Sequence, residues 1–146
     1  MAEEIVGWLI DRGLTIATAE SLTGGLVAAT LTTVPGVSAV FRGGIVAYAA
    51  DLKIALVGVP ASLIGEVGTV HKDVAIAMAE GVRTALGASI GIGTTGVAGP
   101  DSVDGQPAGT VHIAVATPDG TAHEALFLTG SRAAVRAGTV GRVLGL

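Results

Sequence analysis

The chain has 146 residues, with 8 Lys and Arg against 12 Asp and Glu, 50% hydrophobic residues, 23 Gly and no Cys. This length predicts one domain over residues 1–146, and a net charge of −4 without a basic cluster argues against nucleic acid as a partner. The lack of Cys excludes disulfides, thiolate nucleophiles and Cys-based zinc sites.

The apolar residues occur in short blocks rather than in one continuous stretch. No run of about 18 apolar residues is present, so we expect no membrane-spanning segment. Met1–Glu4 is acidic and lacks the basic start of a secretory signal. We therefore expect a cytoplasmic protein that does not act at a membrane.

The first third of the chain alternates between helix and strand patterns. Apolar residues at helical spacing predict a helix over Glu3–Arg12, which Gly13 ends. A short strand over Leu14–Ala19 leads directly into a predicted helix over Ser21–Thr33. An apolar, partly β-branched run over Gly43–Ala50 suits a buried strand.

The middle of the chain contains the clearest helix. Leu52–Val57 is apolar but of uncertain type, whereas Thr69–Leu86 repeats apolar residues at helical spacing and stops before a glycine. Ser89–Gly93 reads as a strand that runs into the Gly-rich loop Thr94–Asp101.

The last third predicts a hairpin and a closing helix. Val111–Thr117 and Ala122–Leu128 flank a Pro-Asp-Gly turn. Ser131–Leu144 is the final helix, with Ser131 as its N-cap. Together the elements predict an α/β fold, a single layered α/β/α domain with a mixed sheet and a late β-hairpin.

The first candidate for chemistry is Ser21, which lies with Gly24 and Gly25 at a strand-to-helix junction. Free backbone N–H groups collect at a helix start and can hold an anion or a developing oxyanion. The alternative is that Ser21 is only a helix N-cap, which is the more common role for a Ser at such a place.

The second candidate is Lys53, whose sequence neighbours are mostly apolar. A lysine deprived of water favours its neutral form, and a neutral amine can take a proton from a serine hydroxyl. The alternative is a solvated lysine that pairs with Asp51.

The third candidate is the loop Thr94–Asp101, in which Gly96 and Gly99 would let backbone N–H groups approach a ligand. It could equally be a tight connection. The three histidines, His71, His112 and His123, do not have the spacing of metal ligands. The loop carboxylates of Asp101 and Asp104 need no explanation beyond that of ordinary surface groups. We therefore expect neither a metal nor another cofactor.

Taken together, these motifs resemble the C-terminal domain of the competence/damage-inducible protein CinA. The resemblance covers nearly the whole chain, and the ordered set is more specific than any one motif. The motifs are Thr-Ala-Glu-Ser-Leu-Thr-Gly-Gly at 18–25, Gly-Gly-Ile-Val-Ala-Tyr at 43–48 with Lys53, Thr-Gly-Val-Ala-Gly-Pro-Asp at 95–101, and Gly-Thr-Val at 109–111.

The resemblance implies an enzyme, because stand-alone members of this family are nicotinamide-nucleotide amidohydrolases. They hydrolyse the carboxamide of nicotinamide mononucleotide (NMN) to nicotinate mononucleotide and ammonia, in pyridine-nucleotide salvage, without a metal. Carried over by position, Ser21 is the nucleophile and Lys53 its general base. The resemblance also implies a homo-oligomer and substrate contacts from Thr23, Gly24, Gly25, Tyr48, Thr95, Gly96, Gly99 and Arg132.

The chain departs from the family pattern at two places. Ala49 and Ala50 stand where the family often has a small polar residue and Asn, and Ser131 stands where it usually has Asp. Arg132 and Arg136 are candidates for holding a phosphate, with an ordinary helix-surface role as the alternative. An alternative function is a weakly catalytic or non-catalytic nucleotide-binding module that works with a separately encoded partner.

Overall fold

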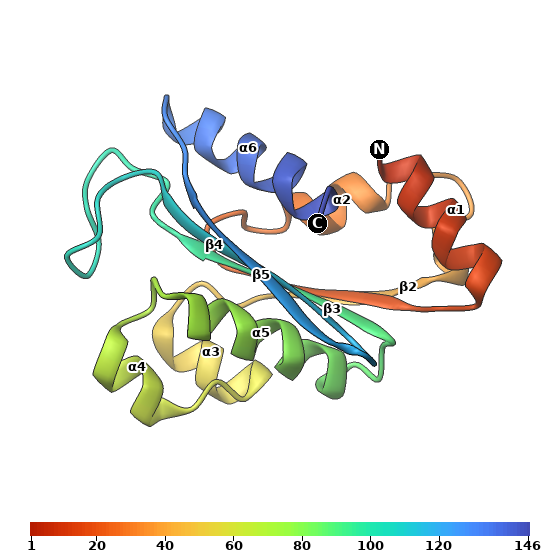
Figure 1. Ribbon diagram of the computed structural model, residues 1–146, viewed down its shortest axis with the longest axis horizontal. Coiled ribbons are helices and arrows are strands. Elements are labelled where there is room, and N and C mark those ends of the chain that lie inside the picture. The colour runs from red at the N-terminus through yellow and green to blue at the C-terminus, as the bar shows by residue number, and fades with distance from the viewer.

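The computed structural model describes residues 1–146, and its centre is one five-stranded sheet in the order β2-β1-β3-β4-β5 (Figure 1). β1 (Ile16–Glu20) pairs in parallel with β2 (Phe41–Val46) and with β3 (Ile90–Gly96). β4 (Thr110–Thr117) runs antiparallel to β3 and to β5 (Gly120–Phe127). The predicted α/β fold with a mixed sheet and a late hairpin is confirmed.

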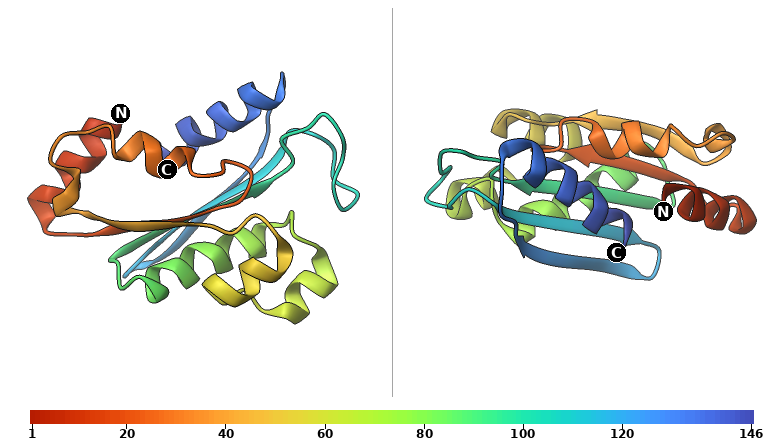
Figure 2. Two further views of the ribbon diagram at one scale, coloured as in Figure 1. Left: turned by 180° about the vertical axis from the view of Figure 1, so that it is seen from behind. Right: turned by 90° about the horizontal axis from the view of Figure 1, so that it is seen from above.

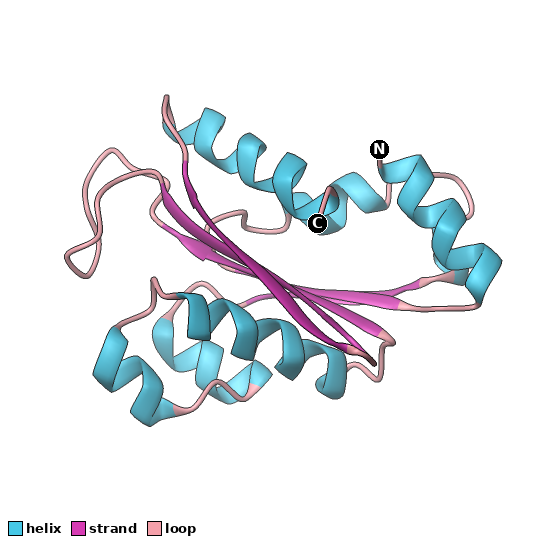
Figure 3. Cartoon of the chain, viewed as in Figure 1, coloured by secondary structure: helices cyan, strands magenta, loops and turns pink.

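Helices cover both faces of this sheet, which gives three layers (Figures 1 and 3). One face carries α1 (Ala2–Arg12), α2 (Leu26–Leu31) and α6 (Arg132–Leu144). The other face carries α3 (Ala50–Val57), α4 (Ala61–Val67) and α5 (Lys72–Ala85). A short 3-10 turn over Val37–Ala39 precedes β2.

The two faces of the sheet have separate apolar cores, because side chains alternate between the faces along each strand. In β1, Ile16 packs into the larger cluster with α1, α2 and α6, whereas Ala17 and Ala19 pack on the face that α3 and α5 cover. The residues of β1 are all buried, as expected for a central parallel strand with helices on both sides.

The α5 layer lies very close to the sheet, and glycines in β3 make this possible. A Cβ added to Gly91 would overlap the carbonyl oxygen of Ala79, and one added to Gly93 would overlap that of Ala75. These small residues therefore set the spacing between α5 and β3.

The predicted helix over Ser21–Thr33 is wrong at its start. Ser21–Gly25 is a turn, and the helix runs only over Leu26–Leu31. Gly24 (φ 56°) and Gly25 (φ 106°) adopt left-handed backbone conformations that no α-helix contains, so the helix begins after them.

The other differences concern element boundaries. The strand predicted over Gly43–Ala50 ends at Val46, and the chain then enters α3, so the uncertain segment Leu52–Val57 is helical. α4 carries no pattern that predicted it, and β3 extends to Gly96, three residues into the predicted loop. None of the helices combines the length and hydropathy needed to cross a bilayer.

Candidate active site

The three parallel strands end at one edge of the sheet, and the candidate residues lie just beyond those ends. Ser21 follows β1 directly, Tyr48 follows β2 by two residues, and Gly96 is the last residue of β3. The carboxyl ends of parallel strands are the usual ligand-binding edge of an α/β sheet. The loop between β3 and β4 extends from this same end of the molecule (Figure 2).

Lys53 and Ser21 form a direct hydrogen bond, although 32 positions separate them in the sequence. The Nζ of Lys53 donates to Ser21 Oγ at 2.9 Å. The same Nζ donates to the carbonyl oxygens of Ala47 at 2.9 Å and Tyr48 at 2.7 Å. These carbonyls belong to the segment between β2 and α3, so the end of one strand holds the amine against the serine hydroxyl that follows another strand.

Lys53 is buried, with only 1% of its surface exposed, although it is a charged residue on a short helix. Burial lowers the pKa of Lys53 from its ordinary value to about 8, and the charge of Asp104 opposes part of that shift. The alternative interpretation of Lys53 as a solvated lysine paired with Asp51 is therefore wrong. An amine with this pKa exists partly as the neutral base near neutral pH.

Ser21 does not cap a helix, so the N-cap interpretation is also wrong. The carboxylate of the buried Glu20 caps α2 instead, accepting from the N–H groups of Val27 at 2.8 Å and Ala28 at 3.0 Å. The N–H of Ser21 donates to the carbonyl of Thr94 in β3 at 3.1 Å. The hydroxyl of Ser21 is thus left available to Lys53.

A cavity of about 290 Å³ opens beside the Ser21–Lys53 pair. Its walls come from the ends of β1, β2 and β3, the segment before α5, the loop after β3 and the start of α6. The lining residues are Ser21, Leu22, Tyr48, Lys53, Thr69, Val70, Thr95, Gly96, Val97, Ala98, Gly99, Pro100, Asp101, Val103 and Arg132.

Of the residues expected around a substrate, five line this cavity together with the Ser21–Lys53 pair: Tyr48, Thr95, Gly96, Gly99 and Arg132. Arg132 joins two of its walls, since Nη1 donates to the carbonyl of Gly99 at 2.6 Å and Nη2 to the hydroxyl of Tyr48 at 3.2 Å.

Thr23, Gly24 and Gly25 do not line the cavity. Thr23 is fully buried, and its hydroxyl bonds that of Thr94 at 2.9 Å, while the two glycines shape the turn that leads into α2. Arg136 does not reach the cavity either. It donates to the carbonyl of Leu22 at 3.0 Å and that of Thr23 at 3.3 Å, and so holds this turn against α6.

The segment between α4 and α5 contributes to the cavity wall, which the sequence did not predict. Thr69 and Val70 from this segment line the cavity. No motif in their neighbourhood carries chemistry, and only the topology brings them to the site. The one available signal was their position directly before a long amphipathic helix that had to cross back to β3.

The chain also matches a known protein family over its whole length. The family model described as the CinA C-terminal domain matches residues 1–146. The chain belongs to this family.

Relatives of this CinA domain are longer than the chain itself. A CinA-like protein of Frankia casuarinae is 49% identical over 142 residues, which are 97% of this chain and 33% of that protein. A CinA-like protein of Anaeromyxobacter dehalogenans is 50% identical over 133 residues, which are 90% of this chain and 33% of that protein. The chain therefore spans about a third of the length of the curated relatives it matches.

Solved structures show that the CinA fold extends over the whole chain. The competence/damage inducible protein CihA from Agrobacterium tumefaciens has a TM-score of 0.94 at 34% identity, covering 99% of this chain and 89% of that one. A CinA superfamily protein from Klebsiella pneumoniae has a TM-score of 0.95 at 32% identity, covering 99% and 91%.

None of the three histidines of this CinA domain lines the cavity. His71 caps α5, since its Nδ1 accepts from the N–H of Asp73 at 3.1 Å. Burial, with smaller contributions from His71 and His123, lowers the pKa of His112. No group of three or more His, Asp or Glu side chains is arranged to hold a metal ion.

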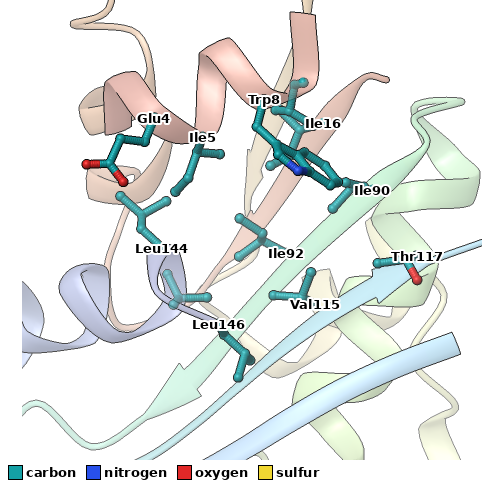
Figure 4. Close-up of a pocket in the computed structure, with 12 residues that line it drawn as sticks. Glu4, Ile5, Trp8, Ile16, Ile90, Ile92, Val115, Thr117, Leu144 and Leu146 are labelled. Atoms are coloured by element: carbon teal, nitrogen blue, oxygen red, sulfur yellow. The ribbon is translucent and has the colours of Figure 1, made fainter. Parts of the chain in front are cut away.

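A second cavity, of about 390 Å³, lies between α1, the end of α6 and the sheet (Figure 4). It is larger than the first, but ten of its twelve lining residues are hydrophobic, and Trp8 and Leu146 lie at its sides. Its two polar side chains are Glu4 and Thr117, and the hydroxyl of Thr117 donates to the carbonyl of Gly120 rather than to a base. The chemistry of the CinA domain is therefore better sought at the Ser21–Lys53 cavity.

Proposed function

We propose that this chain is a nicotinamide-nucleotide amidohydrolase that cleaves the carboxamide of NMN with Ser21 as nucleophile and Lys53 as general base. The observation that carries the proposal is the 2.9 Å contact between Ser21 Oγ and the buried Nζ of Lys53. Membership of the CinA C-terminal domain family supports it.

In the first step, neutral Lys53 takes the proton of the Ser21 hydroxyl as Oγ attacks the carboxamide carbon. Lys53 suits this step because its pKa of about 8 leaves roughly a tenth of the molecules neutral at pH 7. The bond from Oγ to carbon forms, and the carbonyl oxygen becomes an oxyanion.

A backbone N–H group beside the nucleophile is suited to stabilise that oxyanion. The N–H of Leu22, in the turn that follows Ser21, makes no hydrogen bond within the protein. Leu22 also lines the cavity. Donors of this kind are worth about 2.7–4 kcal/mol each in other acyl-transfer sites.

Collapse of the tetrahedral intermediate then breaks the carbon–nitrogen bond. The ammonium form of Lys53 returns its proton to the leaving nitrogen, which departs as ammonia, and Ser21 is left as an acyl ester. Neutral Lys53 next removes a proton from water as the water oxygen attacks the ester. Nicotinate mononucleotide leaves, and Ser21 regains its hydrogen from Lys53.

The remaining lining residues supply chemistry that matches the substrate. Tyr48 offers an aromatic face for the pyridinium ring, since aromatic faces attract cations. Arg132 offers a guanidinium for the phosphate. Gly96 and Gly99 let the loop backbone approach the nucleotide closely.

We place the reaction in cytoplasmic pyridine-nucleotide salvage and expect a homo-oligomer. Exposed apolar side chains on neighbouring elements support the assembly: Val46 on β2, and Leu52 and Leu56 on α3. Sedimentation of the purified chain tests the oligomer.

The test of the proposed function is ammonia release from NMN by the purified chain. Ser21→Ala and Lys53→Ala should each lower the rate by about a thousandfold or more, and EDTA should not change it. Lys72→Ala is the matched control, because Lys72 is the other lysine of the chain and is exposed at the start of α5. A rate that survives Ser21→Ala would overturn the proposal.

The same experiment separates the alternative of a nucleotide-binding module. Calorimetry that shows NMN binding to the wild type and to Lys53→Ala, with no ammonia released by either, would favour that alternative. Free nicotinamide and glutamine, run in parallel, test whether the amidase acts on a different amide.

A further inference from the structure

Thr69 connects three parts of the cavity wall through its backbone and its hydroxyl. Its carbonyl accepts from the hydroxyl of Thr95 in β3 at 2.7 Å. Its own N–H and Oγ1 donate to Oδ2 of Asp104 at 3.1 Å and 2.9 Å. Asp104 lies in the loop between β3 and β4, so one carboxylate oxygen ties this loop to the segment that precedes α5.

The backbone around Asp104 is arranged to make this contact. Asp104 is the one non-glycine residue of the chain with a positive φ, at 51°, and it sits at a turn closed by paired hydrogen bonds between Val103 and Gln106. On the facing segment, a Cβ added to Gly68 would lie 3.2 Å from the Cβ of Asp104. A strained residue on one side and a glycine on the other allow the two segments to approach.

The loop that Asp104 ties down forms one wall of the cavity beside Ser21 and Lys53. Residues 97–101 and 103 of this loop line the cavity, as does Thr69 itself. The loop has a second anchor nearer β3, where Arg132 donates to the carbonyl of Gly99 at 2.6 Å. Without the bonds of Asp104 to Thr69, residues 100–106 of the loop would make no hydrogen bond to another segment of the chain.

We propose that Asp104 is a positioning residue of the active site, which holds the loop between β3 and β4 against Thr69 and thereby shapes the cavity for substrate beside Ser21 and Lys53. This inference rests on the proposed function for its kinetic consequence. It adds to that function a residue whose side chain contacts neither the nucleophile nor the base.

Asp104 also acts on Lys53 through its charge. Hydrogen bonds from Thr69 lower the pKa of Asp104, which keeps its carboxylate ionised, and that negative charge raises the pKa of Lys53 against the effect of burial. The cavity wall also holds Asp101 and Arg132, and Asp51 is exposed on α3. Next to Ser21, the buried carboxylate of Glu20 accepts from two N–H groups of α2.

Two variants separate the effect of the hydrogen bonds between Asp104 and Thr69 from the effect of the charge of Asp104. Asp104→Asn keeps an oxygen that can accept both bonds from Thr69 but removes the charge, whereas Asp104→Ala removes both. Asp119→Ala is the matched control, because it removes an exposed aspartate from the turn between β4 and β5. Each variant is measured for kcat and KM with NMN across pH, and for hydrogen exchange of the Thr69 amide.

For Asp104→Ala we expect exchange of the Thr69 amide to rise about tenfold, the scale of losing exposed hydrogen bonds to a carboxylate. The KM for NMN should rise several-fold with a smaller change in kcat, because the bonds of Lys53 to Ser21, Ala47 and Tyr48 do not involve the loop. Asp104→Asn should keep the exchange rate and the KM near the wild-type values.

The Asn variant should also move the acid limb of the kcat/KM profile to lower pH. Below pH 7, kcat/KM of the Asn variant should be about twofold higher than that of the wild type at low ionic strength. The difference should vanish in high salt, because salt screens the charge of Asp104 in the wild type. Unchanged Thr69 exchange and unchanged KM in Asp104→Ala would overturn the inference. If the wild type released no ammonia, the proposed function alone would fail. Equal exchange of the Thr69 amide in the wild type and in Asp104→Ala would still overturn the proposal that Asp104 holds the loop against Thr69.

Discussion

Glu20 and Ser21 are adjacent in sequence, yet their side chains serve different elements. The carboxylate of Glu20 turns back to the N–H groups of Val27 and Ala28 at the start of α2, while the hydroxyl of Ser21 meets the amine of Lys53. Glu20 is the last residue of β1 and Ser21 is the first residue beyond it, so one strand end both holds the start of a helix and presents a hydroxyl to Lys53.

Removing the carboxylate of Glu20 should destabilise the fold. Glu20→Ala leaves two N–H groups of α2 without an acceptor and should lower the free energy of unfolding by about 2 kcal/mol. Glu20→Gln, which retains one acceptor oxygen, should lose about half as much. Urea denaturation measures both, and equal stability of Glu20→Ala and wild type would contradict the capping role.

Lys53→Arg should abolish activity although it keeps the positive charge. A guanidinium stays protonated throughout the accessible pH range, so it cannot take the proton of Ser21. We expect kcat/KM for NMN to fall by at least about a hundredfold at pH 8. Circular dichroism checks the fold, and Lys72→Arg, at the exposed lysine, provides the control.

The activity should rise with pH through the pKa of Lys53. The base must be neutral, and its pKa is about 8, so kcat/KM should increase about tenfold between pH 7 and pH 9 and then level off. If kcat/KM stays flat over this interval in a protein that remains folded there, Lys53 does not titrate in the rate-determining step.

The lowered pKa of Lys53 also makes the stability of the fold depend on pH. Lys53 has a pKa of about 8 when folded and an ordinary value of 10.5 when unfolded, so between these values the unfolded chain binds more protons. The free energy of unfolding should therefore rise with pH in this window, by about 1 kcal/mol per pH unit relative to Lys53→Met. Parallel urea titrations at pH 8 and pH 10 measure the difference between the two proteins.

The contact between α5 and β3 should tolerate no added methyl group. Gly93→Ala forces a Cβ into the carbonyl of Ala75 and should cost about 1–3 kcal/mol of stability. Gly141→Ala in α6, where no atom lies within 4 Å of the added Cβ, should instead stabilise the chain by about 0.4–1 kcal/mol. Thermal unfolding of the two variants compares them directly.

Most of the fold follows from local patterns, because helices and strands that pack on one layer repeat their apolar residues with a clear period. The helical period identified the helix at Lys72–Ala85, and the Pro-Asp-Gly turn identified the hairpin over 110–127. The helical period was misleading at Ser21–Gly25, where it predicted a helix but two glycines adopt left-handed backbone conformations. It also gave no signal for α4, which is too short for a repeat to show.

The site was predicted as residues but not as a cavity. The sequence places Ser21 and Lys53 in motifs, yet their contact depends on how β2 and α3 return to β1, which is a property of the sheet order. Thr23 illustrates the limit, since it belongs to the same motif as Ser21 but is buried against Thr94. Thr69 illustrates the converse, since it lines the cavity without a motif.

The three acceptors around Lys53 also determine the direction in which its lone pair forms. An ammonium group has three hydrogens, and here they point to Ser21 and to the carbonyls of Ala47 and Tyr48. A neutral amine keeps two hydrogens, and the carbonyls can only accept, whereas the hydroxyl of Ser21 can also donate. When Lys53 loses its proton, its two remaining hydrogens therefore stay bonded to the two carbonyls. The lone pair then points at the hydroxyl of Ser21, so the neutral amine is already oriented to accept the serine proton.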